Sequence, residues 1–244
     1  MKYMGSKARL SKDISPIINK LIKENGINLY IEPFVGGANM IEHIECDMKI
    51  GIDNNKYLIS LWNDLISGWI PPLEMSRDMY NDIKDNKDEY ADSLVAVAGF
   101  CATYNAKWFG GYAGKVKTKI GTVRDYYDEA IRNILKQKDR LLDVKFIHKD
   151  YRQLNIEGSL IYCDPPYQGT TQYGTSKNFN HEEFWDKVRE LSKNNIVLIS
   201  EYNAPDDFVC IFEKTLTTTL DKNSRKKDVE KLFIHNSIQI KEIF

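Results

Sequence analysis

The sequence has few of the residues from which metal centres and cross-linked scaffolds are built. Its four cysteines show no C-x-x-C spacing, which excludes a zinc-finger pattern and a disulfide framework and predicts a reducing, cytoplasmic location. The four histidines are scattered, so no metal is expected. No apolar run is long enough to span a bilayer, and no apolar segment follows the charged N-terminus. A membrane role is therefore excluded.

Charge of one sign is not in excess either. The 244 residues include 34 Lys and Arg against 35 Asp and Glu, so any surface for a polyanion must be local. A chain of this length has room for one domain with a sizeable insertion, and we expect it to be a monomer.

Short apolar runs alternate with helical patterns. Strands are predicted at Leu29–Ile31, Lys49–Ile52, Lys145–His148, Leu160–Cys163 and Ile196–Ser200. An amphipathic helix is predicted from Leu10 to Ile22, kinked or restarted at Pro16, and another over Glu182–Leu191 with Asn180 as its cap. Two β-prone runs, Thr215–Leu220 and Val229–His235, predict a terminal antiparallel hairpin. The alternation indicates an open, mostly parallel α/β sheet that binds ligands at the carboxyl ends of its strands.

The stretch from Asp53 to Lys145 is too long to be a single crossover helix. We therefore predict a small inserted domain over residues 63–143, within a main domain formed by residues 1–62 and 144–244.

The run Asp164-Pro165-Pro166-Tyr167 ends one predicted strand and is the most informative feature of the chain. Proline fixes its own φ and restricts the residue before it, so the corner is rigid. It would hold the Asp164 carboxylate and the Pro165 carbonyl as two acceptors beside the Tyr167 ring. That set suits a planar heterocycle with an exocyclic amino group, because the acceptors take the amine hydrogens and the ring stacks. The alternative is a plain strand-ending turn, since Asp and Pro are common in turns.

A second unit lies upstream. A strand ending at Glu32, the turn Pro33–Ala38, a helix expected to start near Asn39, and a second strand ending at Asp53 form a nucleoside-binding pattern. Asp53 would bind the ribose hydroxyls. The glycine spacing is not G-x-G-x-x-G, which disfavours a pyrophosphate and therefore a nicotinamide cofactor. A cofactor with ribose but no phosphate fits better, and S-adenosylmethionine is such a cofactor.

These motifs, taken in order, resemble those of Dam-type DNA adenine-N6 methyltransferases, and phage-encoded members are most similar. The matching segments are Lys2–Lys7, Glu32–Gly37, Asp53, Asp164–Tyr167 and Ile196–Pro205. The resemblance implies a Rossmann-like methyltransferase sheet closed by the hairpin, with an inserted target-recognition domain. It assigns catalysis to Asp164, Pro165 and Tyr167. It places the cofactor against Tyr3, Lys7, Glu32, Pro33, Phe34, Gly36, Asp53, Asp150, Tyr151 and Asp164. The family's third glycine is replaced here by Ala38.

The predicted insertion has a segment, from Ser93 to Arg124, that contains no acidic residue. Its basic and aromatic side chains suit phosphate contacts and stacking on bases: Tyr104, Lys107, Trp108, Tyr112, Lys115, Lys117, Lys119 and Arg124. The alternative is that the aromatic residues form the core of the small domain. A loop over Lys222–Lys227 is a second basic candidate for contact with double-stranded DNA.

The sequence therefore predicts a site-specific DNA adenine-N6 methyltransferase that acts on a base turned out of the duplex. Three alternatives remain: the same chemistry on cytosine N4, RNA or a protein amide; an inactive DNA-binding decoy or regulatory subunit; and a nicotinamide-dependent oxidoreductase. The leading Asp164 counts against the first, because related enzymes with those substrates more often begin the motif with Ser or Asn.

Overall fold

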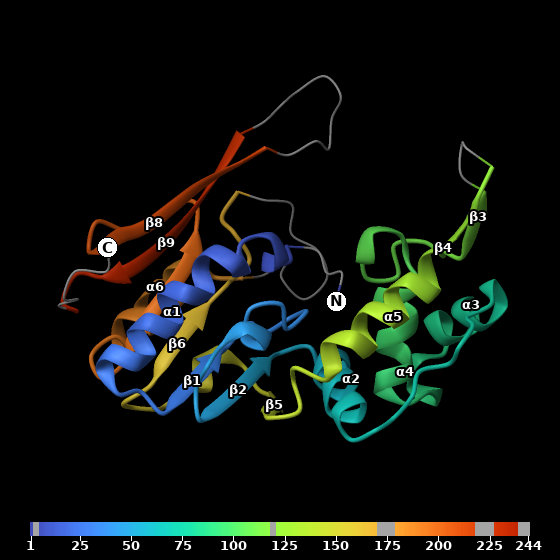
Figure 1. Ribbon diagram of the computed structural model, residues 1–244, viewed down its shortest axis with the longest axis horizontal. Coiled ribbons are helices and arrows are strands. Elements are labelled where there is room, and N and C mark those ends of the chain that lie inside the picture. The colour runs from blue at the N-terminus through green and yellow to red at the C-terminus, as the bar shows by residue number, and fades with distance from the viewer. Residues whose placement is uncertain (2–4, 118–120, 170–178, 218–226, 239–244) are drawn as a thin grey trace.

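The fold is built on one seven-stranded sheet. The computed structural model describes residues 1, 5–117, 121–169, 179–217 and 227–238 (Figure 1). In sequence order the sheet strands are β1 (Leu29–Glu32), β2 (Met48–Asp53), β5 (Val144–His148), β6 (Leu160–Cys163), β7 (Ile196–Glu201), β8 (Phe208–Thr217) and β9 (Lys227–His235). Their spatial order is β5-β2-β1-β6-β7-β9-β8. The first five are parallel, and β9 and β8 form an antiparallel hairpin beside β7. The predicted fold class, the five parallel strands and the antiparallel hairpin are confirmed, but β8 begins at Phe208, before the predicted Thr215, and residues 218–220 of that prediction lie outside the described residues.

The strand order reverses near the middle of the sheet. From β1 the chain moves outward through β2 to β5, then returns to β6 on the other side of β1 and continues to β7. Ligands of open α/β sheets bind outside the carboxyl ends of the strands where the order reverses, here between β1 and β6. All four residues of β6 are buried, as expected for a central parallel strand.

Side-chain alternation divides the core into two layers. Tyr30 and Leu160 pack in a cluster with the buried stripe of α1 (Ser11–Asn25), while their neighbours Ile31 and Ile161 pack in a second cluster with α6 (His181–Leu191). The predicted cap of α6 is confirmed, because the Asn180 side chain accepts hydrogen bonds from the backbone of the first helical turn.

Two local predictions are corrected by the structure. Of the kink or restart predicted at Pro16, the restart is wrong, because α1 is one continuous helix across that residue, and the kink stays a prediction. Pro16 is exposed and lies early in the helix, so it removes one internal hydrogen bond whose carbonyl can meet water, while the apolar stripe stays buried. The helix expected near Asn39 is also absent among the described residues that follow it, where a single 3₁₀ turn, η2 (Ile41–His43), forms instead. Ala38 has φ of 53°, a left-handed conformation that a right-handed helix cannot include.

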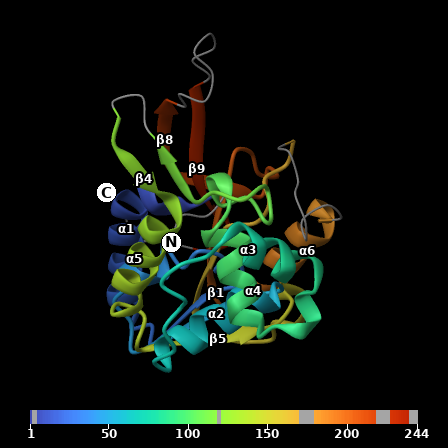
Figure 2. The ribbon, with the colours of Figure 1, turned by 90° about the vertical axis from the view of Figure 1, so that its right-hand side faces the viewer.

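Helices and a small hairpin form the other end of the molecule (Figures 1 and 2). They are α2 (Lys56–Ile66), α3 (Arg77–Asp85), η3 (Lys87–Glu89), α4 (Asp92–Ala96), a π-helical turn η4 (Val97–Cys101), η5 (Tyr104–Ala106), β3 (Lys115–Lys117), β4 (Val123–Asp125) and α5 (Tyr126–Lys138). The predicted boundary at residue 63 falls inside α2. Trp62 of that helix stacks on Phe146 of β5 with ring centroids 5.9 Å apart, so α2 packs directly on the sheet. The inserted domain stays a prediction.

None of the described helices combines the length and apolar character that a bilayer crossing requires.

Candidate functional site

Acidic side chains collect at the carboxyl edge of the parallel strands. Glu32, Asp53 and Glu201 are the last residues of β1, β2 and β7, and Asp164 follows the last residue of β6. Because parallel strands end at the same edge of a sheet, a sequence with an acid at each strand end brings these carboxylates to one edge. Glu32, Asp53 and Asp164 were predicted as site residues. Glu201 was quoted only as part of a motif.

The corner after β6 is held by an ion-pair network. Lys7 Nζ lies 3.1 Å from Asp164 Oδ1 and 3.3 Å from Oε2 of Glu230, a residue of β9. The Tyr167 hydroxyl donates a 2.7 Å hydrogen bond to the same Glu230 oxygen. Lys7 belongs to the turn η1 (Lys7–Arg9), which the Ser6 side chain caps. The structure thus brings the predicted residues Lys7, Asp164 and Tyr167 together and adds Glu230, which the sequence did not indicate.

Burial changes the protonation of this acidic edge. It raises the pKa of Asp164 to about 6, with Lys7 opposing the shift. It raises the pKa of Glu32 to about 8, although the Tyr30 hydroxyl donates a 2.7 Å hydrogen bond to that carboxyl. Burial thus favours the neutral form of both carboxyls, and the Lys7 ammonium favours the charged form of Asp164.

Glu201 fixes the backbone just after the corner. Its carboxylate accepts hydrogen bonds from Gln168 N at 3.1 Å and Tyr202 N at 2.8 Å. Burial raises the pKa of Glu201 to about 7. The end of β7 is thereby tied to the residue that follows Tyr167, so Glu201 helps to orient that ring. Pro165, which links the two halves of the corner, is buried.

The turn after β1 is tied to the end of β2. The two carboxylate oxygens of Asp53 accept from Gly36 N at 3.0 Å and Asn55 N at 2.9 Å. Burial raises the pKa of Asp53 to about 6. A carboxylate has about four acceptor positions, so Asp53 can still accept from a ligand. Residue 51 of β2 must be glycine, because a Cβ there would lie 2.9 Å from the side chains of Phe146 and Val35.

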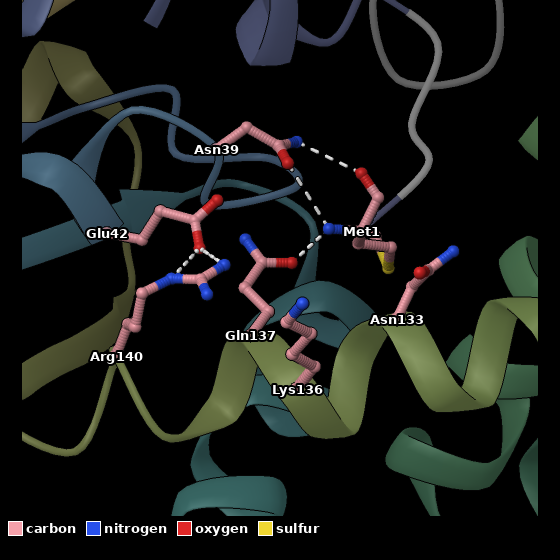
Figure 3. Close-up of a pocket in the computed structure, with 7 residues that line it drawn as sticks. All are labelled: Met1, Asn39, Glu42, Asn133, Lys136, Gln137 and Arg140. Carbon is pink, nitrogen blue, oxygen red and sulfur yellow. Dashed lines mark hydrogen bonds and ion pairs between the residues drawn. The ribbon is translucent and has the colours of Figure 1, made fainter. Parts of the chain in front are cut away.

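The side-chain amide of Gln137, a residue of α5, also holds this turn, and Figure 3 shows that side chain beside Met1. Its amide nitrogen donates to the carbonyls of Gly37 and Ala38, at 3.0 Å each, and its amide oxygen accepts from the Met1 amino group. Asn39 in turn donates to the Met1 carbonyl at 3.1 Å. Gln137 is buried, so these contacts are shielded from water. The sequence gave no indication of this residue, whose partners are about a hundred positions away.

An aromatic group lies beside the turn. The rings of Phe34 and Tyr151 have centroids 5.1 Å apart, and Phe179 lies 5.9 Å from Phe34 and 5.7 Å from Tyr151. Tyr151 begins the turn η6 (Tyr151–Gln153), which the Asp150 side chain caps. The Arg152 guanidinium binds the Asp150 carboxylate and lowers its pKa. Phe34 is thus a neighbour of Tyr151, which follows Asp150, and buried Pro33 precedes Phe34. The role of these residues in binding the cofactor stays a prediction. Tyr3 lies outside the described residues.

The predicted DNA-contacting side chains divide into two groups. Trp108 packs on Phe100 and Tyr57, with centroids 4.6 and 5.1 Å away, and the Tyr112 hydroxyl donates to Met75 O at 2.6 Å. Both rings therefore contribute to the core of the helical end, as the alternative interpretation held. Tyr104 remains 57% exposed.

The basic side chains of that segment lie on the surface. Lys107, Lys115, Lys117 and Arg124 are exposed. Lys115 lies 3.3 Å from a Glu74 oxygen, and Arg124 makes a two-point contact with Glu129 at 2.7 and 2.8 Å. A phosphate would have to replace these acidic partners. Lys119 and residues 222–226 of the second basic candidate lie outside the described residues.

Comparison with known proteins gives concordant matches. A family model described as D12 class N6 adenine-specific DNA methyltransferase matches residues 3–93 and 76–202. The chain is 20% identical over 218 residues to the Type II methyltransferase M.FokI of Planomicrobium okeanokoites, covering 81% of this chain and 33% of that protein. It is 24% identical over 256 residues to the Type II methyltransferase M.MjaIII of Methanocaldococcus jannaschii, covering 87% of each.

The chain therefore spans about a third of M.FokI and most of M.MjaIII. Among solved structures, magnesium protoporphyrin IX methyltransferase from Synechocystis, with bound S-adenosylmethionine, matches at a TM-score of 0.35 and 9% identity. That match covers 93% of this chain and 81% of the other.

Replacing Gln137 by Met should destabilise the protein, because two buried carbonyls lose their donor. The expected loss is about 1–3 kcal/mol in the free energy of unfolding. Calorimetry should show a lower thermal midpoint, by roughly 2–4 °C for each kcal/mol. Asn133→Ala is the matched control, since Asn133 is exposed and lines the same hollow one turn earlier. An unchanged midpoint for Gln137→Met would show that the amide contributes nothing to the turn.

Proposed function

The chain belongs to the D12 class of N6 adenine-specific DNA methyltransferases, and from this premise we propose how its residues perform the transfer. The enzyme moves a methyl group from S-adenosylmethionine to N6 of an adenine turned out of double-stranded DNA. The observation that carries the proposal is the corner after β6. There Asp164 and Tyr167 are held together by Lys7 and Glu230 at the reversal point of the sheet.

Asp164 is proposed to activate the target amine by accepting its hydrogen. The N6 lone pair of adenine is delocalised into the ring, so the amine is a poor nucleophile. An acceptor that favours a pyramidal nitrogen restores the lone pair and stabilises the developing positive charge. The Pro165 carbonyl supplies the second acceptor, and the Tyr167 ring supplies a stacking surface worth about 1–3 kcal/mol per base. Asp164 acts as an acceptor of hydrogen bonds, because a carboxylate is too weak a base to deprotonate the neutral amine beforehand.

The acidic edge and its aromatic neighbours fit the cofactor. When bound, S-adenosylmethionine supplies a methyl group activated by a positively charged sulfur. Asp53 has acceptor positions left for the ribose hydroxyls, and the neighbouring rings of Phe34 and Tyr151, with centroids 5.1 Å apart, are proposed to contact the adenine ring. Gly36, in the turn after β1, and Glu32, at the end of β1, are also proposed to contact the cofactor. Lys7 and Asp164 are proposed to contact its methionine part.

The surface beyond α2 is proposed to bind DNA. Lys107, Lys115, Lys117 and Arg124 would contact phosphates, together with Lys119, and Tyr104 would contact bases. Trp108 and Tyr112 would support that surface from beneath, because both are packed in the core of the helical end. The inserted target-recognition domain would be this region, and we further propose a cytoplasmic monomer.

Replacing Asp164 by Asn should abolish most of the methyl transfer, because the amide keeps the shape but loses the charge that stabilises the amine. Turnover should fall roughly 10²–10³-fold, as for loss of one transition-state contact. The assay is incorporation of tritiated methyl groups into unmethylated plasmid DNA. Asp186→Asn, at an exposed position on α6, should behave like wild type.

The product provides the second arm of this test. Digestion of the treated DNA and mass spectrometry should find N6-methyladenine. N4-methylcytosine alone, or near-normal turnover of Asp164→Asn, would contradict the assignment. Binding of the cofactor without any transfer would favour a decoy or regulatory protein.

Replacing Asp53 by Ala should weaken binding of S-adenosylmethionine by about 2–3 kcal/mol, the upper range for a hydrogen bond to a charged group. Titration calorimetry measures this directly, with the thermal midpoint recorded alongside. Asp47→Ala is the control, because Asp47 is exposed at the amino end of the same strand. Unchanged affinity of Asp53→Ala would move the ribose elsewhere.

Replacing Lys115, Lys117 and Lys119 by Gln should weaken binding to every duplex alike. Loss of three phosphate contacts should reduce the slope of log K against log salt by about 3. Fluorescence anisotropy across a salt series provides the measurement, with Lys12→Gln and Lys23→Gln, on the exposed side of α1, as the control. If the triple variant keeps the wild-type slope, this segment does not contact DNA phosphates.

A further inference from the structure

The ammonium of Lys7 lies where the target amine is expected. It is 3.1 Å from Asp164 Oδ1 and 4.2 Å from the centroid of the Tyr167 ring, over the ring face. These are the two contacts that an adenine would make by donating its amine hydrogen to Asp164 and stacking on that face of Tyr167. A base that takes this position must therefore displace the ammonium, which is itself a hydrogen-bond donor and a cation on an aromatic face.

A displaced Lys7 needs another carboxylate. Its side chain is only 8% exposed, and a buried ammonium that loses its partner is strongly disfavoured. Glu230 supplies the alternative, because its Oε2 is 3.3 Å from Nζ and its side chain is 13% exposed. A small movement of Nζ toward Glu230 would free Asp164 without leaving an unpaired cation.

Glu230 also sets the net charge of the pocket. With Glu230 ionised, Lys7 is balanced by that residue and Asp164 keeps its negative charge for a cationic ligand or a developing ammonium. Without that charge, Lys7 would neutralise Asp164 instead. The Tyr167 hydroxyl donates to the same Glu230 oxygen, so one carboxylate orients both the cation and the stacking ring.

We propose that Glu230 is a positioning residue that takes the Lys7 ammonium from Asp164 when the target base enters the pocket. This proposal rests on the proposed methyl transfer and deepens it. Lys7 then has two states: shared between Asp164 and Glu230 when the base is absent, as in this structure, and bound to Glu230 alone when the base is present. Glu230 contacts no reacting atom and acts through Lys7 and Tyr167.

Glu230→Gln tests the charge without changing the shape. The amide oxygen can still accept from Tyr167, but Lys7 should now remain with Asp164. We expect kcat/KM for unmethylated plasmid DNA to fall about 10-fold, in the range for a hydrogen bond to a charged group. In a Lys7→Met background no ammonium needs to move, so adding Glu230→Gln should change kcat/KM by less than about twofold. A purely structural role of Glu230 would cause equal losses in both backgrounds.

A second readout is the pH dependence of kcat at saturating S-adenosylmethionine, measured in proteins that keep Lys7. Its acid limb is the range in which kcat falls as the pH drops. The groups that act on Asp164 are Lys7, Glu32, Tyr162, Tyr167, Glu201 and Glu230. Transfer requires the Asp164 carboxylate, so the rate should fall as pH drops through the pKa of Asp164. The Glu230 charge raises that pKa, so Glu230→Gln should move the acid limb to lower pH.

The outcomes separate the two levels of the proposal. If the wild-type protein transfers no methyl group, the proposed function fails. If it does, equal losses in the two backgrounds overturn the role of Glu230. If Lys7→Met shows no measurable transfer, the acid limb of wild type is compared with that of the single variant Glu230→Gln. An acid limb at unchanged pH overturns the proposal, and a shift of the limb to lower pH supports it.

Discussion

One buried cation holds the acidic edge of this sheet together. Several carboxylates at neighbouring strand ends would repel one another, and burial has already raised the pKa of Glu32 to about 8. Lys7 offsets this by pairing with Asp164 and Glu230 at once. The pairs link the N-terminal turn, the corner after β6 and the terminal hairpin, segments that are far apart in the sequence. The conformation of the corner therefore depends on a residue that precedes the first helix.

The turn after β1 shows a second form of the same constraint. Its backbone is held by side chains from three other elements: Asp53 at the end of β2, Trp62 of α2, which donates to Gly36 O at 3.0 Å, and Gln137 of α5. With its amides and carbonyls fixed in this way, the turn needs no helix behind it. These contacts also account for the left-handed conformation of Ala38, a non-glycine residue with φ of 53°.

Local patterns in the sequence were sufficient for the parallel strands, the terminal hairpin and the Asn180 cap, because short apolar runs and capping depend on neighbouring residues. They also placed Glu32, Asp53 and Asp164 at one edge, since the ends of parallel strands coincide. Glu230 could not be found this way. Its position follows from the pairing of Glu201 with Lys231, and nothing local in a polar loop and a β-prone run specifies that register. Trp108 was ambiguous for a related reason: an aromatic beside glycines suits a core as well as a ligand.

The contact from Gln137 to the turn bears on how recognition specificity could be exchanged between related enzymes. Cutting at both ends of the whole 63–143 segment would divide α2 and remove α5, and so would take away supports of the turn after β1 together with the surface proposed to bind DNA. We therefore propose a smaller exchangeable module, which begins after Ile66 and ends before Tyr126, so that α2 and α5 stay with the sheet. A chimera built on those junctions would carry residues 67–125 from another enzyme and would keep the native contacts that hold the turn after β1.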